Sequence, residues 1–261
     1  MTATPMSDRD LDAVAERLAA DIADGDHFPA WLSGTLDLDA ALAVQVRLLR
    51  RRLGRGEQLA GWKVGLTSDR ARRALDADVR PFGFILARYV FPSDAEVVAA
   101  AIRHASIEPE FLFTVASRLG GPDLSPDDVR AGIDRVAAGF ELNERRAGTT
   151  RPDLVAMATD RMTQWGVVEG AGTDPNGLDL DDVEVRMWDN GEERLASRSG
   201  EEVDDHWTSI TRLVTELDRH GLALEPGQKV ITGGLGRFDL VAGHRWRASF
   251  EGIGEVAIRA T

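Results

Sequence analysis

The sequence of 261 residues contains no cysteine and no long apolar run. Without cysteine, the chain forms no disulfide and carries out no thiol chemistry. No apolar stretch approaches the ~18 residues of a membrane span, and the N-terminus lacks a cationic segment followed by an apolar one. We therefore expect neither a membrane anchor nor a signal peptide, and we expect a cytoplasmic protein.

Positive charge is also scarce. The chain has 31 Lys and Arg against 44 Asp and Glu, which gives a formal net charge of −13. Nucleic acids and anionic membranes would repel such a chain, so neither is expected as a partner. Hydrophobic residues make up 43% of the sequence, enough to fill the core of a large domain.

Two carboxylates stand two residues apart in the segment 106–113, which otherwise has the composition of a buried strand. Side chains alternate between the faces of a strand, so Glu108 and Glu110 point the same way. At an effective dielectric of about 20, two charges ~4 Å apart repel by roughly 4 kcal/mol, so a half-buried ionised pair needs a cation. Oxygen ligands suit Mg²⁺, Mn²⁺ or Ca²⁺. Taken alone, the pair favours a solvated acidic face, which arises easily in a chain with 44 Asp and Glu.

Two further charged residues lie in apolar segments. Glu141 follows Gly139-Phe140, and Lys63 lies in the run Gly61-Trp62-Lys63-Val64-Gly65-Leu66-Thr67. Glu141 is a candidate third ligand, and a partly desolvated Lys63 can move protons or stabilise an oxyanion. The alternatives are a surface acid at a strand end and a lysine that reaches water from an edge strand.

These segments, with Ile231-Thr232-Gly233-Gly234 and Glu251-Gly252-Ile253-Gly254, resemble in order and spacing the 2-keto-4-pentenoate hydratase and 4-oxalocrotonate decarboxylase family of the fumarylacetoacetate hydrolase superfamily. The resemblance extends from about Leu38 to the C-terminus. It implies that three carboxylates hold one Mg²⁺ or Mn²⁺: Glu108, Glu110 and Glu141. It also implies a homo-oligomer.

The resemblance implies an activity and a set of residues for it. The activity is that of a divalent-metal-dependent lyase, a hydratase or a decarboxylase, acting on a 2-oxo acid or its enol through a metal-stabilised enolate. Lys63 and His206 take the catalytic roles. The remaining residues implied to contact the substrate are Gly65, Leu66, Thr232 and Gly233, the last two through a hydroxyl and a backbone N–H that meet a substrate carboxylate.

The segments that shape the substrate site depart from the family pattern. Family hydratases carry an Asp where this chain has Pro81, which cannot act as a base, and Asp76 or Asp78 would replace it only in a shifted loop register. The other departures are Arg161-Met162-Thr163-Gln164 in place of Asp-Asn-Ala-Ser, Asp204-Asp205-His206-Trp207 in place of Leu-Gly-His-Pro, and Leu42 in place of a common Tyr. They suggest a different substrate, bulkier or less polar.

Two alternative functions remain. A C–C bond hydrolase or a biosynthetic enzyme of the same superfamily would need a positioned base, for which His206 or His104 is available. An accessory subunit with a weakened site would keep the fold alone, although the intact carboxylates and Lys63 argue against it.

Hydrophobic periodicity and turn residues predict the elements. The predicted helices are 11–22 after the cap Ser7-Asp8, 38–53 after Asp37, 126–136 after Ser125, and 207–219 before Gly221; 27–36 is a predicted loop. The predicted strands are 61–66, 97–102, 107–115, 140–143, 183–188, 229–232 and 252–258, with a hairpin turn at Asp189-Asn190-Gly191. The expected fold is α+β: a helical region over 1–58 that caps a fumarylacetoacetate-hydrolase-like domain with a mixed β-sheet roll over 59–261.

Overall fold

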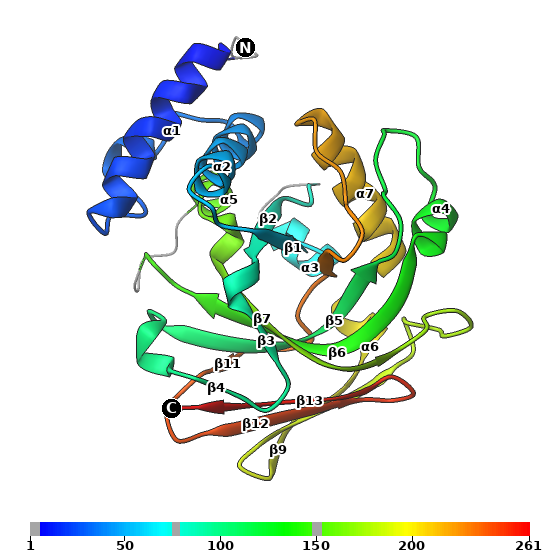
Figure 1. The fold of residues 1–261 in the computed structure, drawn as a ribbon. Coiled ribbons are helices and arrows are strands. Elements are labelled where there is room, and N and C mark those ends of the chain that lie inside the picture. Colours follow the sequence, from blue (N-terminus) through cyan, green and yellow to red (C-terminus); the bar gives the residue numbers. More distant parts are fainter. Residues whose placement is uncertain (1–5, 75–78, 148–152) are drawn as a thin grey trace.

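The computed structural model describes residues 6–74, 79–147 and 153–261. Within them two β-sheets pack against each other, and helices lie around the open side of the larger one (Figure 1). The larger sheet has the order β2-β1-β10-β5-β6-β7-β3, with β11 added beside β5, and the second has the order β4-β13-β12-β8-β9. Because β1 pairs parallel with β10 and antiparallel with β2, the larger sheet is mixed, as predicted.

The strands are short except in the centre of the larger sheet. That sheet contains β1 (Leu59–Val64), β2 (Phe82–Leu86), β3 (Val90–Pro92), β5 (Ala105–Val115), β6 (Ile133–Glu144), β7 (Gln164–Thr173), β10 (Lys229–Ile231) and β11 (Phe238–Asp239). The second sheet contains β4 (Ala95–Val97), β8 (Glu184–Asp189), β9 (Glu192–Arg198), β12 (Arg245–Phe250) and β13 (Gly254–Ala260). The long strands β5 and β6 form the backbone of the site.

The helices fall into three long ones and several short ones. They are α1 (Asp8–Ala23), α2 (Leu38–Leu53), α3 (Asp69–Ala74), α4 (Pro126–Ala131), α5 (Leu154–Thr159), α6 (Ser199–Glu202) and α7 (His206–Arg219), with 3₁₀ turns η1 (Ala30–Leu32), η2 (Ala87–Tyr89), η3 (Ala99–Ala101) and η4 (Arg161–Thr163). None of the helices in the described residues is both long and apolar enough to cross a membrane.

Local signals placed the long helices correctly. The Ser7 side chain accepts from the backbone N–H of Asp10 at the start of α1, and Asp37 does the same for Ala40 at the start of α2. The last turn of α2 carries three arginines, which suits the negative end of the helix dipole. Both helices precede the first strand, and the division into a helical region and a catalytic domain stays a prediction.

Other predicted boundaries were wrong. The helix predicted over 126–136 ends at Ala131, because Gly132 caps it and the chain from Ile133 pairs with β5. The strand predicted over 97–102 stops at Val97 and continues as the turn η3. Sequence reasoning also missed β2, β3, β7, β9, β11 and β12. Of these, β3 and β11 pair with strands far away in the sequence, whereas β9 and β12 each form a hairpin with a neighbouring strand.

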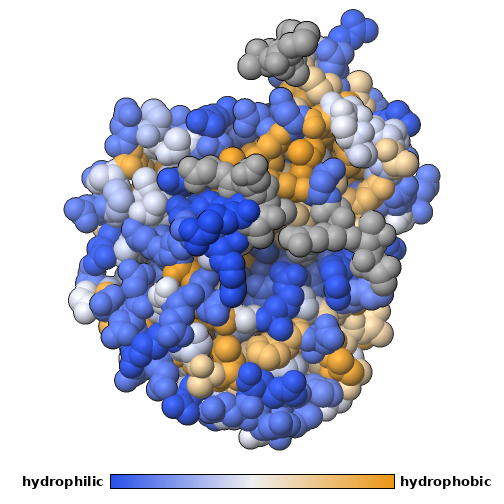
Figure 2. Space-filling model, turned by 180° about the vertical axis from the view of Figure 1, so that it is seen from behind, coloured by the Kyte–Doolittle hydropathy of each residue, from blue (hydrophilic) through white to orange (hydrophobic). Residues whose placement is uncertain are grey.

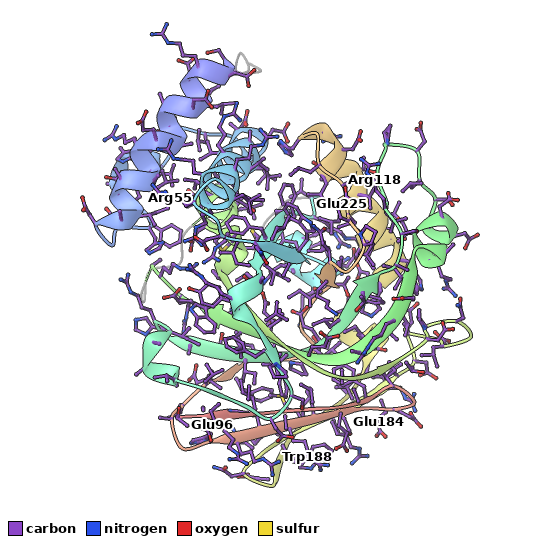
Figure 3. The ribbon with its side chains drawn as sticks, viewed as in Figure 1. Arg55, Glu96, Arg118, Glu184, Trp188 and Glu225 are labelled. Carbon is purple, nitrogen blue, oxygen red and sulfur yellow. The ribbon has the colours of Figure 1, made fainter. Side chains whose placement is uncertain are left out.

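The second sheet carries a confirmed hairpin. Asn190 and Gly191 have φ of 49° and 87° between β8 and β9, as a two-residue hairpin turn requires. The Arg247 guanidinium of β12 lies over the ring of Trp188 of β8, 4.1 Å from the ring centroid. Figure 3 labels three side chains of this sheet, Glu96, Glu184 and Trp188. Seen from behind, the surface is mostly hydrophilic with an apolar area in its upper part (Figure 2).

Part of the core lies between the sheets and distinguishes the two faces of the larger sheet. Phe111 of β5 meets Phe250 of β12 with ring centroids 5.1 Å apart. Because side chains alternate along β5, Glu110 points away from this core. The larger sheet therefore turns one face to the second sheet and the other to the carboxylates.

Candidate metal centre

Three buried carboxylates converge on one point of the larger sheet. Glu108 of β5 pairs directly with Glu141 of β6, and Glu110 lies two residues further along β5. One oxygen from each carboxylate lies within 4.8 Å of the others. Their exposed fractions are 7% for Glu108, 1% for Glu110 and 0% for Glu141. The predicted same-face arrangement of the first two is confirmed.

Two cations partly compensate the three carboxylates. The Lys63 ammonium on β1 donates to Glu141 Oε2 at 2.6 Å. The Arg237 guanidinium, which is half exposed, pairs with the Glu108 carboxylate. With all five groups ionised, the cluster keeps one net negative charge. Sequence reasoning missed Arg237, and nothing near it in the sequence marked it.

Burial and mutual repulsion raise the pKa of two of these carboxyls. Burial raises the pKa of Glu110 well above its ordinary value, and the charges of Glu141 and Glu108 raise it further. Burial also raises the pKa of Glu108, although the Arg237 charge opposes the shift. The fold therefore holds acids together at a cost in free energy that a bound cation would offset.

Asn143 connects the carboxylates. Its Nδ2 donates to Glu108 Oε1 and to Glu141 Oε2, both at 3.0 Å. Its Oδ1 accepts from Thr163 Oγ1 at 3.0 Å. Sequence reasoning missed Asn143, although a signal was present: it follows Glu141 by two residues on the same strand and so shares its face.

The turn after β10 closes the site. The backbone N–H of Gly233 donates to Glu110 Oε2 at 2.9 Å. Gly234 comes so close that a Cβ built on it would lie 1.9 Å from Glu108 Oε2. Thr232 is fully buried, and its Oγ1 lies 2.7 Å from His206 Nδ1. The predicted substrate contacts Thr232 and Gly233 thus have partners within the protein, and their roles stay predictions.

His206 lies behind this turn. Its ring packs on Phe111, with centroids 4.7 Å apart, on the face of β5 opposite to the carboxylates. Burial lowers the pKa of His206 to about 4, so the imidazole is neutral at pH 7. Its Nε2 is buried and has no hydrogen-bond partner among the described residues. His206 therefore reaches the site through Thr232, and its catalytic role stays a prediction.

The other predicted residues lie just after β1. The backbone N–H of Gly65 donates to the Pro81 carbonyl at 2.7 Å, and Leu66 has a φ of 55°. This turn brings Pro81 near the end of the strand that carries Lys63. Asp76 and Asp78 lie outside the described residues. His104 is exposed, next to the start of β5.

The side chains present fit a hard divalent cation. Such ions take oxygen ligands, and carboxylates are their usual protein donors. Glu141 Oε1 is buried without a hydrogen-bond partner in the described part of the chain. A buried carboxylate oxygen without a partner is costly, and a metal ion would satisfy it. Glu108, Glu110 and Glu141 could therefore hold the ion that the sequence predicts.

Comparison with known proteins gives related sequences, although no family model matches the chain. The chain is 30% identical over 229 residues to 2-keto-4-pentenoate hydratase 2 of Dechloromonas aromatica (strain RCB), covering 85% of each protein. It is 27% identical over 231 residues to 2-hydroxyhexa-2,4-dienoate hydratase of Comamonas testosteroni, covering 87% of each. It is 25% identical over 225 residues to 4-oxalocrotonate decarboxylase of Pseudomonas putida, covering 84% of each.

Solved structures show the same fold. The 4-oxalocrotonate decarboxylase of Pseudomonas putida G7, complexed with magnesium and adipate, superposes with a TM-score of 0.89 at 23% identity, covering 99% of this chain and 100% of that one. Fumarylpyruvate hydrolase of Pseudomonas aeruginosa, in complex with Mn²⁺ and pyruvate, gives a TM-score of 0.58 at 16% identity, covering 77% and 88%. The first likeness includes the N-terminal helices, and the second covers a smaller part of the chain.

Proposed function

The chain belongs to the 2-keto-4-pentenoate hydratase and 4-oxalocrotonate decarboxylase family of the fumarylacetoacetate hydrolase superfamily, and from this we propose that it is a divalent-metal-dependent lyase acting on a 2-oxo acid or its enol. The observation that carries the proposal is the group of three buried carboxylates with the Lys63 ammonium among them. Relatives of this chain are named as hydratases and decarboxylases, and a structural neighbour is complexed with magnesium.

We assign Mg²⁺ or Mn²⁺ to Glu108, Glu110 and Glu141. When bound, the ion supplies Lewis acidity that stabilises negative charge developing on a substrate oxygen. Asn143 orients two of the carboxylates through its amide. The backbone N–H of Gly233 fixes the third. The acids are thus held in place before substrate arrives, which reduces the reorganisation needed during the reaction.

Lys63 is the proposed proton donor. Its ammonium is buried at the wall of the site and donates to Glu141 Oε2 at 2.6 Å. Arg237 lies at the edge with about half of its side chain exposed, where its guanidinium can meet a substrate carboxylate. We propose further substrate contacts from Gly65, Leu66, Thr232 and Gly233, and a positioning role for His206 through the Thr232 hydroxyl.

Pro81 bears on the choice between water addition and loss of CO₂. It occupies the position where family hydratases carry Asp, and its carbonyl accepts a hydrogen bond from the backbone N–H of Gly65. Hydration needs a group that handles the proton of water, and proline has none. Both reactions need stabilised negative charge on the 2-oxo oxygen. We therefore propose that the site forms such charge readily and that hydration is its weaker activity.

The direct test uses purified protein with Mg²⁺ and, in parallel, with EDTA. With Mg²⁺ we expect turnover of 4-oxalocrotonate or of 2-hydroxyhexa-2,4-dienoate, and loss of the C3 proton signals of 2-oxobutyrate in D₂O by NMR. EDTA should stop all of these. If neither Mg²⁺ nor Mn²⁺ supports turnover or exchange, the lyase proposal is wrong, and C–C hydrolysis or an accessory role becomes the better reading.

A gain-of-function variant tests the role of Pro81. Pro81→Asp should raise the hydration rate of the dienoate and leave proton exchange into 2-oxobutyrate nearly unchanged. Pro81→Ala, which brings no carboxylate, is the matched control. Efficient hydration by the unmodified protein, at a kcat/KM of ~10⁴ M⁻¹s⁻¹ or more, would instead make it an ordinary hydratase.

We also propose that the protein is a cytoplasmic homo-oligomer. Support for association comes from Val98 and Val241, large apolar side chains that are 57% and 50% exposed. Both lie beside the end of β13. Val98 follows Val97, which pairs with Ala260 of β13. Val241 lies two residues before Gly243, whose backbone N–H donates to the Ala260 carbonyl. The test compares the molecular mass of the double variant Val98→Asp/Val241→Asp with that of the unmodified protein by light scattering. If this surface is the interface, the variant should have the lower mass. An unchanged mass would exclude it as the interface.

A further inference from the structure

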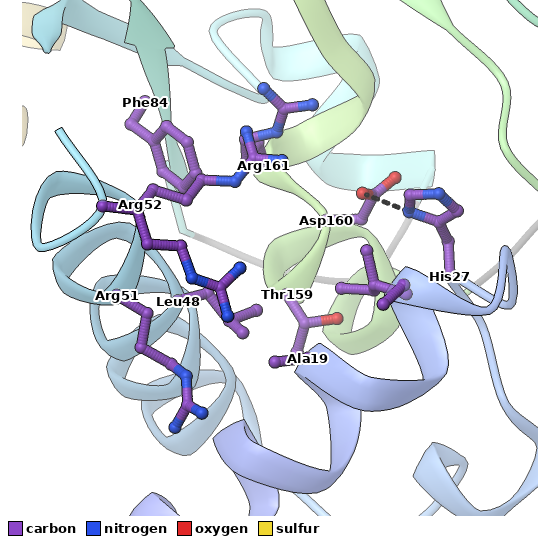
Figure 4. A pocket seen from close by; sticks show the side chains of 12 residues that line it. Ala19, His27, Leu48, Arg51, Arg52, Phe84, Thr159, Asp160 and Arg161 are labelled. Atoms are coloured by element: carbon purple, nitrogen blue, oxygen red, sulfur yellow. Dashed lines mark ion pairs between the residues drawn. The ribbon is translucent and has the colours of Figure 1, made fainter. Parts of the chain in front are cut away.

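Apart from the metal centre, a cavity of about 300 Å³ lies between α1, α2, β2 and the turn η4. Figure 4 shows side chains from these elements turned toward it. Four arginines line it: Arg51, Arg52, Arg55 and Arg161. Its apolar part includes Leu48 and Phe84. A concentration of positive charge at one place is notable in a chain with a net charge of −13.

Arg161 is the buried cation of this cavity. It is 8% exposed, and its Nη1 is buried without a hydrogen-bond partner among the described residues. Its guanidinium carbon lies 5.2 Å from the centroid of the Phe84 ring. The neighbouring Asp160 carboxylate is bonded to Arg146 at 2.7 Å and lies 3.5 Å from His27. Burying a charge is costly unless it is paired, and the Asp160 charge that acts on Arg161 is shared with Arg146.

Arg52 of α2 repeats this pattern, with its guanidinium carbon 6.0 Å from the centroid of the Phe84 ring. Its Nη1 is also buried without a hydrogen-bond partner in the described ranges. Its nearest acid, Glu57, stands 3.9 Å from Arg52 Nε and closer to Arg88, at 3.1 Å. Burial lowers the pKa of Arg52, the Glu57 charge opposes this shift, and the charges of Arg88 and Arg146 add to it. Arg51 and Arg55 are exposed at the rim and add their positive charges to the cavity.

The cavity is separate from the metal centre. In the pairing of β1 with β2, Gly83 stands opposite Lys63, and Phe84 opposite Trp62. Successive side chains point to opposite faces, so Phe84 and Lys63 lie on different sides of these strands. A molecule resting on Phe84 therefore does not occupy the space beside the three carboxylates.

We propose that this cavity binds a small organic anion whose carboxylate or phosphate group pairs with Arg161 and Arg52 and whose apolar body rests on Phe84 and Leu48. Guanidinium groups bind both oxyanions through paired N–H donors. The volume suits a small molecule. An aromatic or aliphatic body matches the apolar wall. Arg161 Nη1 and Arg52 Nη1, which have no hydrogen-bond partner among the described residues, would donate to the charged headgroup.

The test measures binding by calorimetry to metal-free protein, so that a metal ion does not attract the probe. Benzoate and phenyl phosphate carry the two headgroups, and benzyl alcohol is the neutral analogue. We expect one site per chain for benzoate, phenyl phosphate or both, with a Kd below about 1 mM, and no binding of benzyl alcohol. The ratio of the two affinities identifies the preferred headgroup.

Variants place the site. Arg161→Met and Arg52→Gln should each weaken binding at least tenfold. Because a buried change can disturb folding, the exposed Arg55→Gln serves as a second variant and should weaken it about threefold. Arg118→Gln is the matched control, since Arg118 is exposed and paired with Glu225, and it should leave affinity unchanged. Glu110→Gln, at the metal centre, should leave it unchanged as well.

Three results would overturn the proposal. The first is no binding at millimolar benzoate and phenyl phosphate. The second is equal binding of benzyl alcohol, or affinity that is the same in Arg161→Met, Arg52→Gln and Arg55→Gln. The third is a change in oligomeric mass in the arginine variants without anion binding, which would mean that carboxylates of a second copy of the chain pair with these arginines.

Discussion

At the scale of single residues, Lys63 and Glu141 form a buried ion pair inside an acidic cluster. Removing one partner of such a pair costs about 3–5 kcal/mol, because the other charge is left uncompensated. The amide of Asn143 still bonds to Glu141, so the carboxylate keeps its position. Lys63 therefore contributes to stability in metal-free protein and, in the proposed function, to the chemical step.

Lys63→Met should separate these two contributions. Without metal we expect the variant to lose roughly 10 °C in Tm, and with saturating Mg²⁺ to approach the unmodified protein within a few degrees. Its kcat should stay reduced by about 10²-fold or more. Lys229→Met is the matched control. Lys229 forms an ion pair with Glu169, with Nζ 2.8 Å from Oε1, and this pair does not include any of the three carboxylates. Unchanged kcat in Lys63→Met would assign Lys63 a structural role only.

His206 gives the protein a pH dependence that can be isolated. Its pKa is about 4 in the folded state and close to 6.5 in an unfolded chain. Between these values the unfolded state binds more protons, so stability falls as pH falls from 6.5 toward 4. At pH 5 the imidazole should cost about 2 kcal/mol relative to pH 7.

His206→Gln should remove this component. Urea denaturation of the unmodified protein at pH 7 and pH 5 should show the loss, and the variant should show a loss smaller by about 2 kcal/mol. His220→Gln is a control with a half-buried imidazole, whose pKa burial also lowers, so its effect should be smaller. Identical pH dependence in His206→Gln and unmodified protein would contradict the assignment.

At the scale of elements, the turn between β10 and β11 builds the site from its backbone. Gly233 donates to Glu110, and Gly234 leaves room for the Glu108 carboxylate. Glu108 has little freedom to move away, since Asn143 and Arg237 both bond to it. The metal site therefore depends on a turn that supplies no ligand of its own.

Gly234→Ala tests this dependence. A Cβ would stand 1.9 Å from Glu108 Oε2 and 2.8 Å from its carboxyl carbon, so the carboxylate must move. We expect Mg²⁺ affinity to fall at least tenfold, about 1.4 kcal/mol, in calorimetric titration. Gly54→Ala is the control, because its Cβ would meet no atom closer than 3.4 Å. Equal affinity in both variants would show that the turn is not part of the site.

At the scale of the whole molecule, a ligand that binds only the folded chain stabilises it by mass action. Mg²⁺ at 100 times its Kd should add ~2.7 kcal/mol. For a chain of this size that corresponds to a rise in Tm of roughly 5–10 °C. Removal of the metal with EDTA should reverse the shift.

Glu110→Gln should abolish the Mg²⁺-dependent rise in Tm. In metal-free protein the same variant should be more stable than the unmodified one, because it removes one of three buried like charges. Glu96→Gln is the control: Glu96 is exposed on the second sheet and should leave both results unchanged (Figure 3). A Mg²⁺ shift that persists in Glu110→Gln would mean that the ion binds elsewhere.

The sequence by itself determined features that depend on near neighbours. The two-residue period of a strand put Glu108 and Glu110 on one face, and the Ser7 and Asp37 side chains began the two N-terminal helices. Asn143 was within reach of the same argument, two residues after Glu141. Alternation and capping act over a few residues, so they can be read without a fold.

Only the tertiary structure decided which distant residues meet. Arg237 reaches Glu108 across 129 positions of sequence, and Thr163 reaches Asn143 across 20. The packing of α7 also decided that the His206 ring lies on Phe111 and meets the Thr232 hydroxyl, and its catalytic role stays a prediction. Such distances depend on how strands far apart in the chain pair and curl, and local periodicity carries no information about that pairing.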